Sequence, residues 1–207
     1  MTVIAILPPS LLWAASLSAS NDGAKGPLCA IDLRQSKGQI RIAAVDGHRC
    51  FRCYVPIGSF FVPEEPIRLS PKAFKAPTKQ TMTVEIDDSG LAFFKNKLGE
   101  ITSSVSWMPE PWATSEQTFP NIDQIWPDDE SLSCCPNEFI AIDAAYIADF
   151  AKIATKLSAS GIIRMFSDKS ASPMVWRTLA NNYWLNDQTG ETWLEYLLMP
   201  LFVRREA

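Results

Sequence analysis

The chain has 207 residues, of which 47% are hydrophobic and 20% are charged, and its formal net charge is −4. This length is enough for one or two domains with a real hydrophobic core, and the composition excludes an intrinsically disordered chain. The acidic balance does not exclude nucleic acid, because a protein with net negative charge can still present a basic inner surface.

The five cysteines, Cys29, Cys50, Cys53, Cys134 and Cys135, have no regular disulfide spacing, which favours a reducing, cytoplasmic compartment. Cys50 and Cys53 lie three residues apart in a predicted strand, so we expect their thiols on opposite faces. The chain has one histidine and no second C-x-x-C pair. We therefore expect no metal site and no cofactor.

The apolar start, residues 2–20, has the composition of a secretory signal peptide, and secretion stays open as an alternative. However, no Lys or Arg precedes Lys25, and Pro8-Pro9 interrupts the apolar run. A signal peptide needs a basic start, and a membrane span needs a longer apolar stretch. We therefore expect neither a leader nor contact with a membrane.

In chain order, one pattern recurs three times: a strand, a short helix, and then two or three strands. The first copy covers residues 2–58, with strands at 3–7, 28–33, 39–45 and 50–56 and a helix at 11–17. Turn signals separate these elements, namely Pro8-Pro9-Ser10, Asn21-Asp22-Gly23, Ser36-Lys37-Gly38 and Asp46-Gly47.

The second copy covers residues 65–108, with strands at 67–69, 82–86, 91–95 and 101–107 and a helical turn at 72–76. Ser70-Pro71 starts this turn and Pro77 ends it. The proline- and acid-rich stretch that follows, residues 109–137, is predicted to be a connector with an ordered centre at 119–126.

The third copy covers residues 137–203, with strands at 138–142, 162–166, 173–179 and 193–203. Its helix at 144–157 has the clearest periodicity in the chain. The predicted apolar face consists of Ile147, Phe150, Ala151, Ala154 and Leu157, and the opposite face of Asp149, Lys152 and Lys156.

Units this small cannot bury their own apolar faces, so they are expected to pack side by side into continuous antiparallel sheets. The predicted fold class is α+β, built from repeated β-α-β-β units. We expect residues 1–118 to form one domain of two units, residues 119–136 a connector, and residues 137–207 the third unit.

Three short segments are informative in combination. Residues 43–50 read AAVDGHRC at the end of a strand, residues 119–125 read FPNIDQI, and residues 196–201 read YLLMPL. In this order they resemble the bacterial DNA polymerase III β subunit (sliding clamp) family, which carries an A-T-D-G-H-R-L strand end, an F-P-x-x-R-x-(V/I) segment and a terminal V-M-P-M-R. The resemblance covers most of residues 3–127 and 137–203.

The resemblance implies a DNA-clamp fold and a shared peptide pocket. In this family the three segments converge on a hydrophobic pocket that receives short peptides from DNA polymerases, clamp loaders and repair proteins. Aliphatic and thioether side chains give such a pocket adaptable apolar walls. Carried over to this sequence, the partner-peptide pocket consists of Leu28, Val45, Gly47, His48, Arg49, Cys50, Pro120, Gln124, Ile125, Leu197, Met199, Pro200 and Leu201.

The sequence departs from the family pattern at four positions. Gln124 stands where the family has arginine, Val45 where it has threonine, Cys50 where it has leucine, and Phe202 where it has the terminal arginine. These departures leave the peptide specificity of the pocket open.

The resemblance also implies a ring around double-stranded DNA, with helices lining a central hole. Contact with phosphates needs only diffuse positive charge and no sequence readout. The candidate DNA-facing residues are Lys25, Lys72, Lys75, Lys79, Lys152 and Lys156. The alternative for these lysines is an ordinary solvated helix face.

The count of units predicts the assembly. Family rings contain twelve such units, so a chain with three of them predicts a homotetramer with cyclic or dihedral closure. The expected function is that of a processivity factor, and the short chain suggests a mobile genetic element. The alternative is a clamp-like module or decoy that binds client peptides without encircling DNA.

An enzyme is the competing class of function. Asp46, His48 and Cys50 could form a catalytic group, but the chain offers no second histidine and no nucleophile, phosphate-loop or metalloprotease motif. A Cys–His pair also needs a third group that orients the base. We therefore expect no catalysis.

Overall fold

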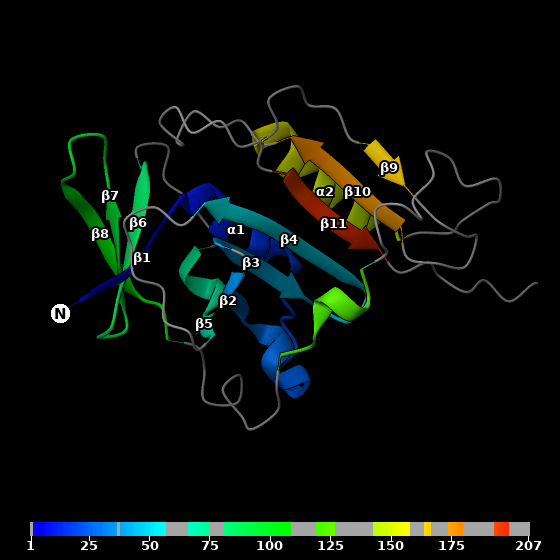
Figure 1. The fold of residues 1–207 in the computed structure, drawn as a ribbon, viewed down its shortest axis with the longest axis horizontal. Coiled ribbons are helices and arrows are strands. Elements are labelled where there is room, and N and C mark those ends of the chain that lie inside the picture. Colours follow the sequence, from blue (N-terminus) through cyan, green and yellow to red (C-terminus); the bar gives the residue numbers. More distant parts are fainter. Residues whose placement is uncertain are drawn as a thin grey trace, which may run out of the picture.

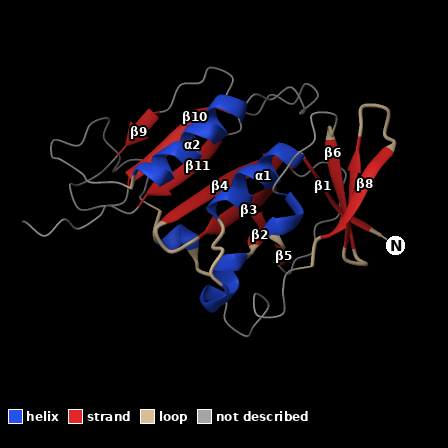
Figure 2. Ribbon diagram, turned by 180° about the vertical axis from the view of Figure 1, so that it is seen from behind, coloured by secondary structure: helices blue, strands red, loops and turns tan. Residues whose placement is uncertain are grey.

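The computed structural model describes residues 2–36, 38–56, 66–74, 81–108, 119–126, 143–157, 164–166, 174–179 and 193–198. Its strands form two antiparallel sheets, a seven-stranded sheet in the order β5-β2-β3-β4-β11-β10-β9 and a four-stranded sheet in the order β1-β6-β7-β8. Helices α1 and α2 lie on the same face of the seven-stranded sheet, behind it in Figure 1 and in front of it in Figure 2. The mixed, strand-rich architecture agrees with the predicted α+β class.

The helices and strands have the following bounds. The strands are β1 (Val3–Leu7), β2 (Ile31–Ser36), β3 (Gln39–Val45), β4 (Arg49–Pro56), β5 (Ile67–Leu69), β6 (Thr83–Asp87), β7 (Leu91–Lys95), β8 (Ile101–Ser106), β9 (Arg164–Phe166), β10 (Met174–Leu179) and β11 (Trp193–Leu198). The α-helices are α1 (Pro9–Ser18) and α2 (Ala144–Leu157), and short 3-10 helices cover Gly23–Cys29 (η1), Pro71–Phe74 (η2) and Ile122–Gln124 (η4).

The predicted strand at 28–33 begins later than expected. The chain forms a 3-10 helix through Cys29, and β2 starts at Ile31. The Asp22 carboxylate accepts a hydrogen bond from the Ala24 N–H and caps this helix. The predicted strand at 138–142 lies outside the described residues.

The first strand of each of the first two copies joins the sheet of the other copy. β1 pairs with β6 in the four-stranded sheet, and β5 pairs with β2 in the seven-stranded sheet. The two copies are therefore interlocked rather than simply adjacent. Both sheets contribute side chains to one core, among them Leu7, Leu33 and Val84.

Helix α1 is apolar on nearly every side. Leu11, Leu12, Ala14 and Ala15 are all 0% exposed, and the helix contacts β3, β4 and η2. A helix without a polar face is stable only when it is enclosed, as α1 is here. Through η2, the second copy supplies part of the cover that α1 of the first copy needs.

The third copy extends the seven-stranded sheet. β11 pairs antiparallel with β4, so Leu197 lies opposite Cys50 and Leu194 lies opposite Cys53. The predicted buried face of α2 needs a correction: Phe150, Ile153, Ala154 and Leu157 are buried, whereas Ile147 is 36% exposed. The first turn of α2 instead packs through the half-buried Tyr146.

Among the described residues, no helix is long and apolar enough to cross a bilayer.

Candidate functional site

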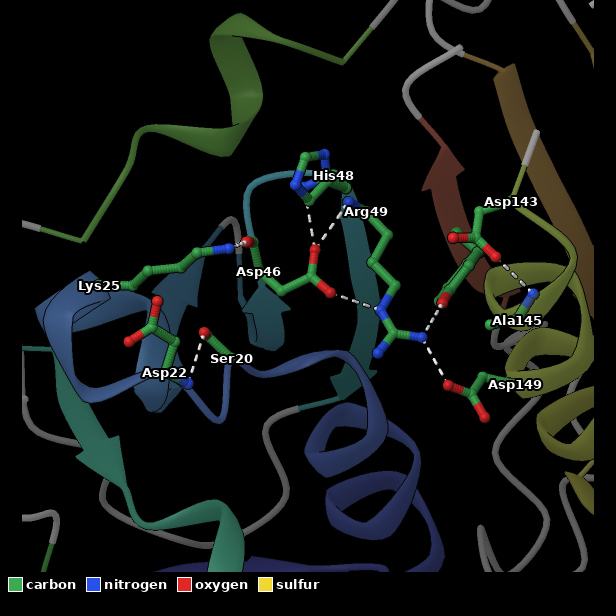
Figure 3. Close-up of polar contacts among 10 residues, drawn as sticks. Ser20, Asp22, Lys25, Asp46, His48, Arg49, Asp143, Ala145 and Asp149 are labelled. Atoms are coloured by element: carbon green, nitrogen blue, oxygen red, sulfur yellow. Dashed lines mark hydrogen bonds and ion pairs between the residues drawn. The ribbon is translucent and has the colours of Figure 1, made fainter. Parts of the chain in front are cut away.

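The turn between β3 and β4 is held by Asp46. Its carboxylate accepts hydrogen bonds from the backbone N–H groups of His48 at 2.9 Å and Arg49 at 3.0 Å. Gly47 has a φ of 95°, a value that side chains disfavour, which explains the glycine at this position. The Lys25 ammonium donates to the Asp46 carbonyl at 2.7 Å and ties η1 to the turn (Figure 3).

An apolar cluster lies on the face of the seven-stranded sheet that points away from α1 and α2. Side chains alternate along a strand, so Val45 and Cys50 point to this outer face while Ala44 and Phe51 point to the helices. We call this group the outer cluster; it contains Ala43, Val45, Cys50, Phe119, Ile122, Trp126, Val175 and Leu197, with Leu28 packed against it. The outer cluster therefore draws on all three sequence segments that carry the family resemblance.

A network of ion pairs borders the outer cluster on the same face. Arg41 pairs with Asp123 at 2.7 Å and with Asp32 at 3.2 Å. Arg52 pairs with Glu195 and lies 3.7 Å from the centroid of the Trp126 ring. These contacts fasten the connector segment 119–126 to the sheet.

Glu195 accepts from two arginines, since the Arg177 Nε also donates to it at 2.7 Å. Asp123 receives a second arginine as well, with Arg52 at 3.6 Å. Buried charges are tolerated when each has a partner of opposite sign, and this network meets that condition. Sequence patterns did not reveal it, because its members come from β2, β3, β4, β10, β11 and the connector.

Arg49 points to the helix side of the sheet. Its guanidinium bonds to Asp46 at 2.8 Å, to Asp149 on α2 at 2.6 Å and to the Tyr196 hydroxyl at 3.1 Å (Figure 3). It also lies 4.7 Å from the centroid of the Tyr146 ring. Arg49 thus joins the β3–β4 turn to α2, and its head does not lie over the outer cluster where the family resemblance put it.

The groups around Arg49 have shifted pKa values. Burial raises the pKa of Tyr196 to about 12, against the opposing effect of Arg49. Burial also disfavours ionisation of Asp149, but the hydrogen bonds from Arg49 and Lys152 outweigh it and lower the pKa of this carboxyl. The ion pair between Arg49 and Asp149 is therefore charged at neutral pH.

The other residues expected in the pocket differ in their exposure to solvent. Val45, Cys50 and Leu197 are at most 6% exposed and form the floor of the outer cluster. Ile125 is 44% exposed at the end of η4, next to the exposed Gln124, and Pro120 is half-buried. Exposed His48 stacks on Tyr146 with a ring-centroid distance of 6.1 Å, and Gly47 is exposed beside it. Met199, Pro200 and Leu201 lie outside the described residues.

Sequence reasoning missed several contributors to this face. Phe119, Ile122 and Trp126 are buried in the outer cluster, and Arg52 covers Trp126. The predicted ordered centre at 119–126 was the available signal, since four large apolar residues in eight positions are expected to contact a core.

The cysteines of the C-x-x-C are separated as expected. Cys50 belongs to the outer cluster and Cys53 to the core on the helix side. Burial raises the pKa of both thiols. A protonated, enclosed thiol is a poor nucleophile, which disfavours Cys50 as a catalytic group. In the part of the chain that the structure describes, no group of His, Cys, Asp and Glu side chains could hold a metal ion.

Three of the expected DNA-facing lysines are exposed on helices of the described chain, and one is engaged at a turn. Lys152 and Lys156 are exposed on α2; the Lys152 ammonium is 2.9 Å from Asp149, and the Lys156 ammonium lies 4.2 Å from the Trp13 ring centroid on α1. Lys72 is exposed on η2, which packs against α1. Lys25 instead bonds to the β3–β4 turn, and Lys75 and Lys79 lie outside the described residues.

The sequence matches no family model and no curated protein. Solved structures do share its fold. The sliding clamp (DNA polymerase III subunit beta) of Bartonella birtlesii superposes with a TM-score of 0.64 at 15% identity, covering 97% of this chain and 66% of that one. The Bacillus subtilis sliding clamp gives 0.62 at 14% identity, covering 98% and 64%.

The β subunit from the DNA polymerase of Streptococcus pyogenes gives 0.60 at 12% identity and covers 97% of this chain and 67% of that one. The chain thus has the fold of the DNA polymerase III β sliding clamps, as the sequence segments predicted. It spans 66% of the length of the Bartonella clamp.

Proposed function

We propose that this chain, which has the sliding-clamp fold, is a shortened and divergent sliding clamp that tethers a DNA polymerase and a clamp loader to duplex DNA. The observation that carries the proposal is the meeting of three distant segments in the outer cluster, represented by Val45, Ile122 and Leu197. These are the segments that in the sliding-clamp family form the peptide pocket. The proposed role is binding and retention, without catalysis, in the cytoplasm.

The outer cluster is suited to hold an apolar peptide side chain. Its floor is buried and apolar, and half-buried Leu28 packs against it. In the proposal, Pro120 and Ile125 of the connector complete a partly exposed border. Apolar contact gives a short peptide its affinity, and a few polar groups fix its direction. Exposed Gln124 and His48 are the candidates for those polar contacts. In the proposal, Met199, Pro200 and Leu201 complete the wall.

The opposite face of the sheet is the proposed DNA side. It carries α1 and α2 and the exposed lysines Lys72, Lys152 and Lys156. Lys75 and Lys79 would add to this charge, whereas Lys25 is engaged at the β3–β4 turn. A few phosphate contacts give weak, salt-dependent binding, so retention on DNA would come from closure of a ring.

The proposed assembly follows from the organisation of the chain. Residues 1–118 form one domain of two units, residues 119–136 a connector, and residues 137–207 a third unit. Four chains then supply twelve units and close a homotetramer around duplex DNA. Light scattering and electron microscopy test this directly: a tetrameric particle with a central hole is expected, and a stable monomer at micromolar concentration would refute the ring.

The peptide site can be tested with two exposed isoleucines. Ile125 is 44% exposed in the connector, next in sequence to buried Trp126 of the outer cluster, and Ile147 is 36% exposed on α2, on the helix side. We expect Ile125→Ala to weaken binding of a fluorescent peptide from a replicative DNA polymerase about tenfold, and Ile147→Ala to leave it unchanged. Met199→Ala should also weaken it. Equal affinities in fluorescence polarisation for all variants would show that the peptide binds elsewhere.

The DNA side can be tested by reversing charge. We expect the double variant Lys152→Glu and Lys156→Glu to lose stimulation of the polymerase on primed circular DNA while it keeps peptide binding. Lys97→Glu is the matched control, since Lys97 is exposed at the turn between β7 and β8, in the other sheet. Unchanged stimulation in the double variant would favour a decoy that binds clients without encircling DNA.

A further inference from the structure

The outer face of the seven-stranded sheet carries arginines on neighbouring strands. Residues that lie directly opposite one another in a pair of strands share a face of the sheet. Arg52 lies opposite Glu195 on one side and Ala43 on the other, and Ala43 lies opposite Asp32. Because Ala43 belongs to the outer cluster, this whole row lies on the outer face. We call the arginines of this face the arginine patch; its members are Arg34, Arg41, Arg52, Arg68 and Arg177.

Positive charge exceeds negative charge on this face. Among the described side chains on the outer face of the sheet and in η4, the five arginines of the patch meet three carboxylates, so the formal charge is +2. These carboxylates belong to Asp32, Asp123 and Glu195. The whole chain has a formal net charge of −4. Positive charge gathered on one face of an acidic protein favours an anionic partner there.

Two members of the patch, Arg34 and Arg41, are incompletely neutralised. They lie directly opposite each other on β2 and β3, an arrangement in which like charges repel. Both depend on the same oxygen of Asp32, which is 3.2 Å from Arg41 and 3.7 Å from Arg34. The Nε atoms of both arginines have no hydrogen-bond partner. The Arg34 side chain is 38% exposed, so its guanidinium is accessible to a further carboxylate.

An acidic protein segment fits the arginine patch better than DNA does. The planar guanidinium matches a carboxylate through paired N–H groups. Arg52 and Arg177 are only 12% and 16% exposed and both pair with Glu195, which leaves little accessible surface for a continuous row of phosphates. The exposed lysines Lys152 and Lys156 lie on α2, which covers the opposite face (Figure 2). The outer face is therefore suited to separate carboxylates on a peptide.

The arginine patch begins next to the outer cluster. Along β3, Val45 of the outer cluster is four residues from Arg41, which corresponds to roughly 13 Å at the rise of a strand. Arg52 lies opposite Ala43, about half of that distance from Val45. An extended peptide rises by a similar length per residue. Acidic side chains about two to four positions from its apolar anchor would therefore reach the patch.

We propose that the arginine patch binds acidic residues that flank the apolar anchor of a partner peptide, and that it thereby selects among client peptides by charge. The inference rests on the proposed function, because it takes the outer cluster as the place where the anchor binds. It adds an electrostatic contact to the apolar one. Such a contact adds specificity and makes binding depend on salt, whereas the apolar contact by itself does not.

The first test compares two fluorescent peptides that differ only in charge. Both carry the client motif of a replicative DNA polymerase; aspartates flank the apolar anchor on both sides in one peptide, and asparagines replace them in the other. We expect wild-type protein to bind the aspartate peptide about tenfold more tightly in fluorescence polarisation at low salt. High salt should remove this preference, since ions screen exposed charges. Equal affinities at low salt would overturn the proposal.

Charge reversal at one position locates the contact. Arg34→Glu removes the accessible guanidinium, while Asp32 keeps its ion pair with Arg41. We expect this variant to prefer the aspartate peptide by about twofold or less and to bind the asparagine peptide as wild-type protein does. Lys97→Glu changes the net charge equally in the other sheet, and it should keep the wild-type preference. A full preference in Arg34→Glu protein would overturn the proposal, and the salt comparison decides the matter if this variant does not fold.

DNA is the competing ligand, and the same proteins test it. If duplex DNA displaces the aspartate peptide from wild-type protein and binds Arg34→Glu protein more weakly, the patch binds phosphate and the proposal is wrong. Equal binding of the two peptides would remove this inference and leave the proposed function in place. Failure of wild-type protein to bind either peptide would remove both.

Discussion

The two faces of the seven-stranded sheet are built differently. On the helix side, large side chains fill the core, and Phe51, Phe150 and Tyr196 are all 0% exposed. On the outer side, a small apolar cluster adjoins arginine–carboxylate pairs such as Arg52 with Glu195. Apolar packing stabilises the helix side, whereas on the outer side buried ion pairs attach the connector segment 119–126 to the sheet. This division agrees with the proposal that the outer face receives a partner peptide.

The largest expected loss of stability comes from a substitution in the core on the helix side of the sheet. Phe150 stacks on Tyr196 at a centroid distance of 4.8 Å and meets the Trp176 ring edge-on at 5.9 Å. Phe150→Ala should lower the free energy of unfolding by about 3–5 kcal/mol, because it leaves a large cavity. Ile147→Ala, on the exposed side of the same helix, should cost under about 1 kcal/mol. Similar losses in urea unfolding would contradict the described orientation of α2.

A smaller effect is expected on the outer face, where two arginines can be compared. The Arg52 side chain is 12% exposed and pairs with Glu195, whereas Arg34 is 38% exposed and lies 3.7 Å from Asp32. Arg52→Met should cost about 1–3 kcal/mol, since Glu195 keeps only Arg177. Arg34→Met should cost about 0–1 kcal/mol. Denaturant unfolding measures both, and an equal cost would mean that the network does not fasten the connector.

A third prediction concerns the link between the β3–β4 turn and α2. Because the folded state lowers the pKa of Asp149, its ion pair with Arg49 stabilises the protein above the ordinary carboxyl pKa. That contribution is lost as pH falls below about 4, through the lowered pKa. Asp149→Asn should cost about 1 kcal/mol at pH 7 and less at acid pH. An undiminished cost at acid pH would show that the contact is not ionic.

The smallest effect concerns the two buried thiols, one on each face. Burial raises the pKa of Cys50 and of Cys53, so neither forms a thiolate at neutral pH. Native protein treated with iodoacetamide should stay unmodified at both residues, while denatured protein should react at both. Mass spectrometry of peptides provides the measurement. Rapid native modification of Cys50 alone would mean that the outer cluster opens.

Local sequence patterns predicted the bounds of a strand or helix correctly where its periodicity was clear and turn residues flanked it. The strands at 3–7, 39–45 and 91–95 and the helix at 144–157 have the predicted bounds, because clear periodicity and turn residues enclose each of them. The predicted start of a strand at residue 28 was wrong, since apolar composition cannot distinguish a strand from a 3-10 helix capped by Asp22. Ile147 was misplaced because helical periodicity does not say which neighbour the first turn meets.

The order of three motifs by itself determined the clamp fold and identified Val45, Cys50 and Leu197 as neighbours. Only the tertiary structure decided that β1 and β5 exchange between units, that Arg49 turns to the helices, and that Arg52 and Trp126 border the outer cluster. The physical reason is that alternation along a strand encodes which side chains share a face, but not which strands become neighbours. Strand partners are selected by burial over the whole molecule, where α1 is enclosed by β3, β4 and η2.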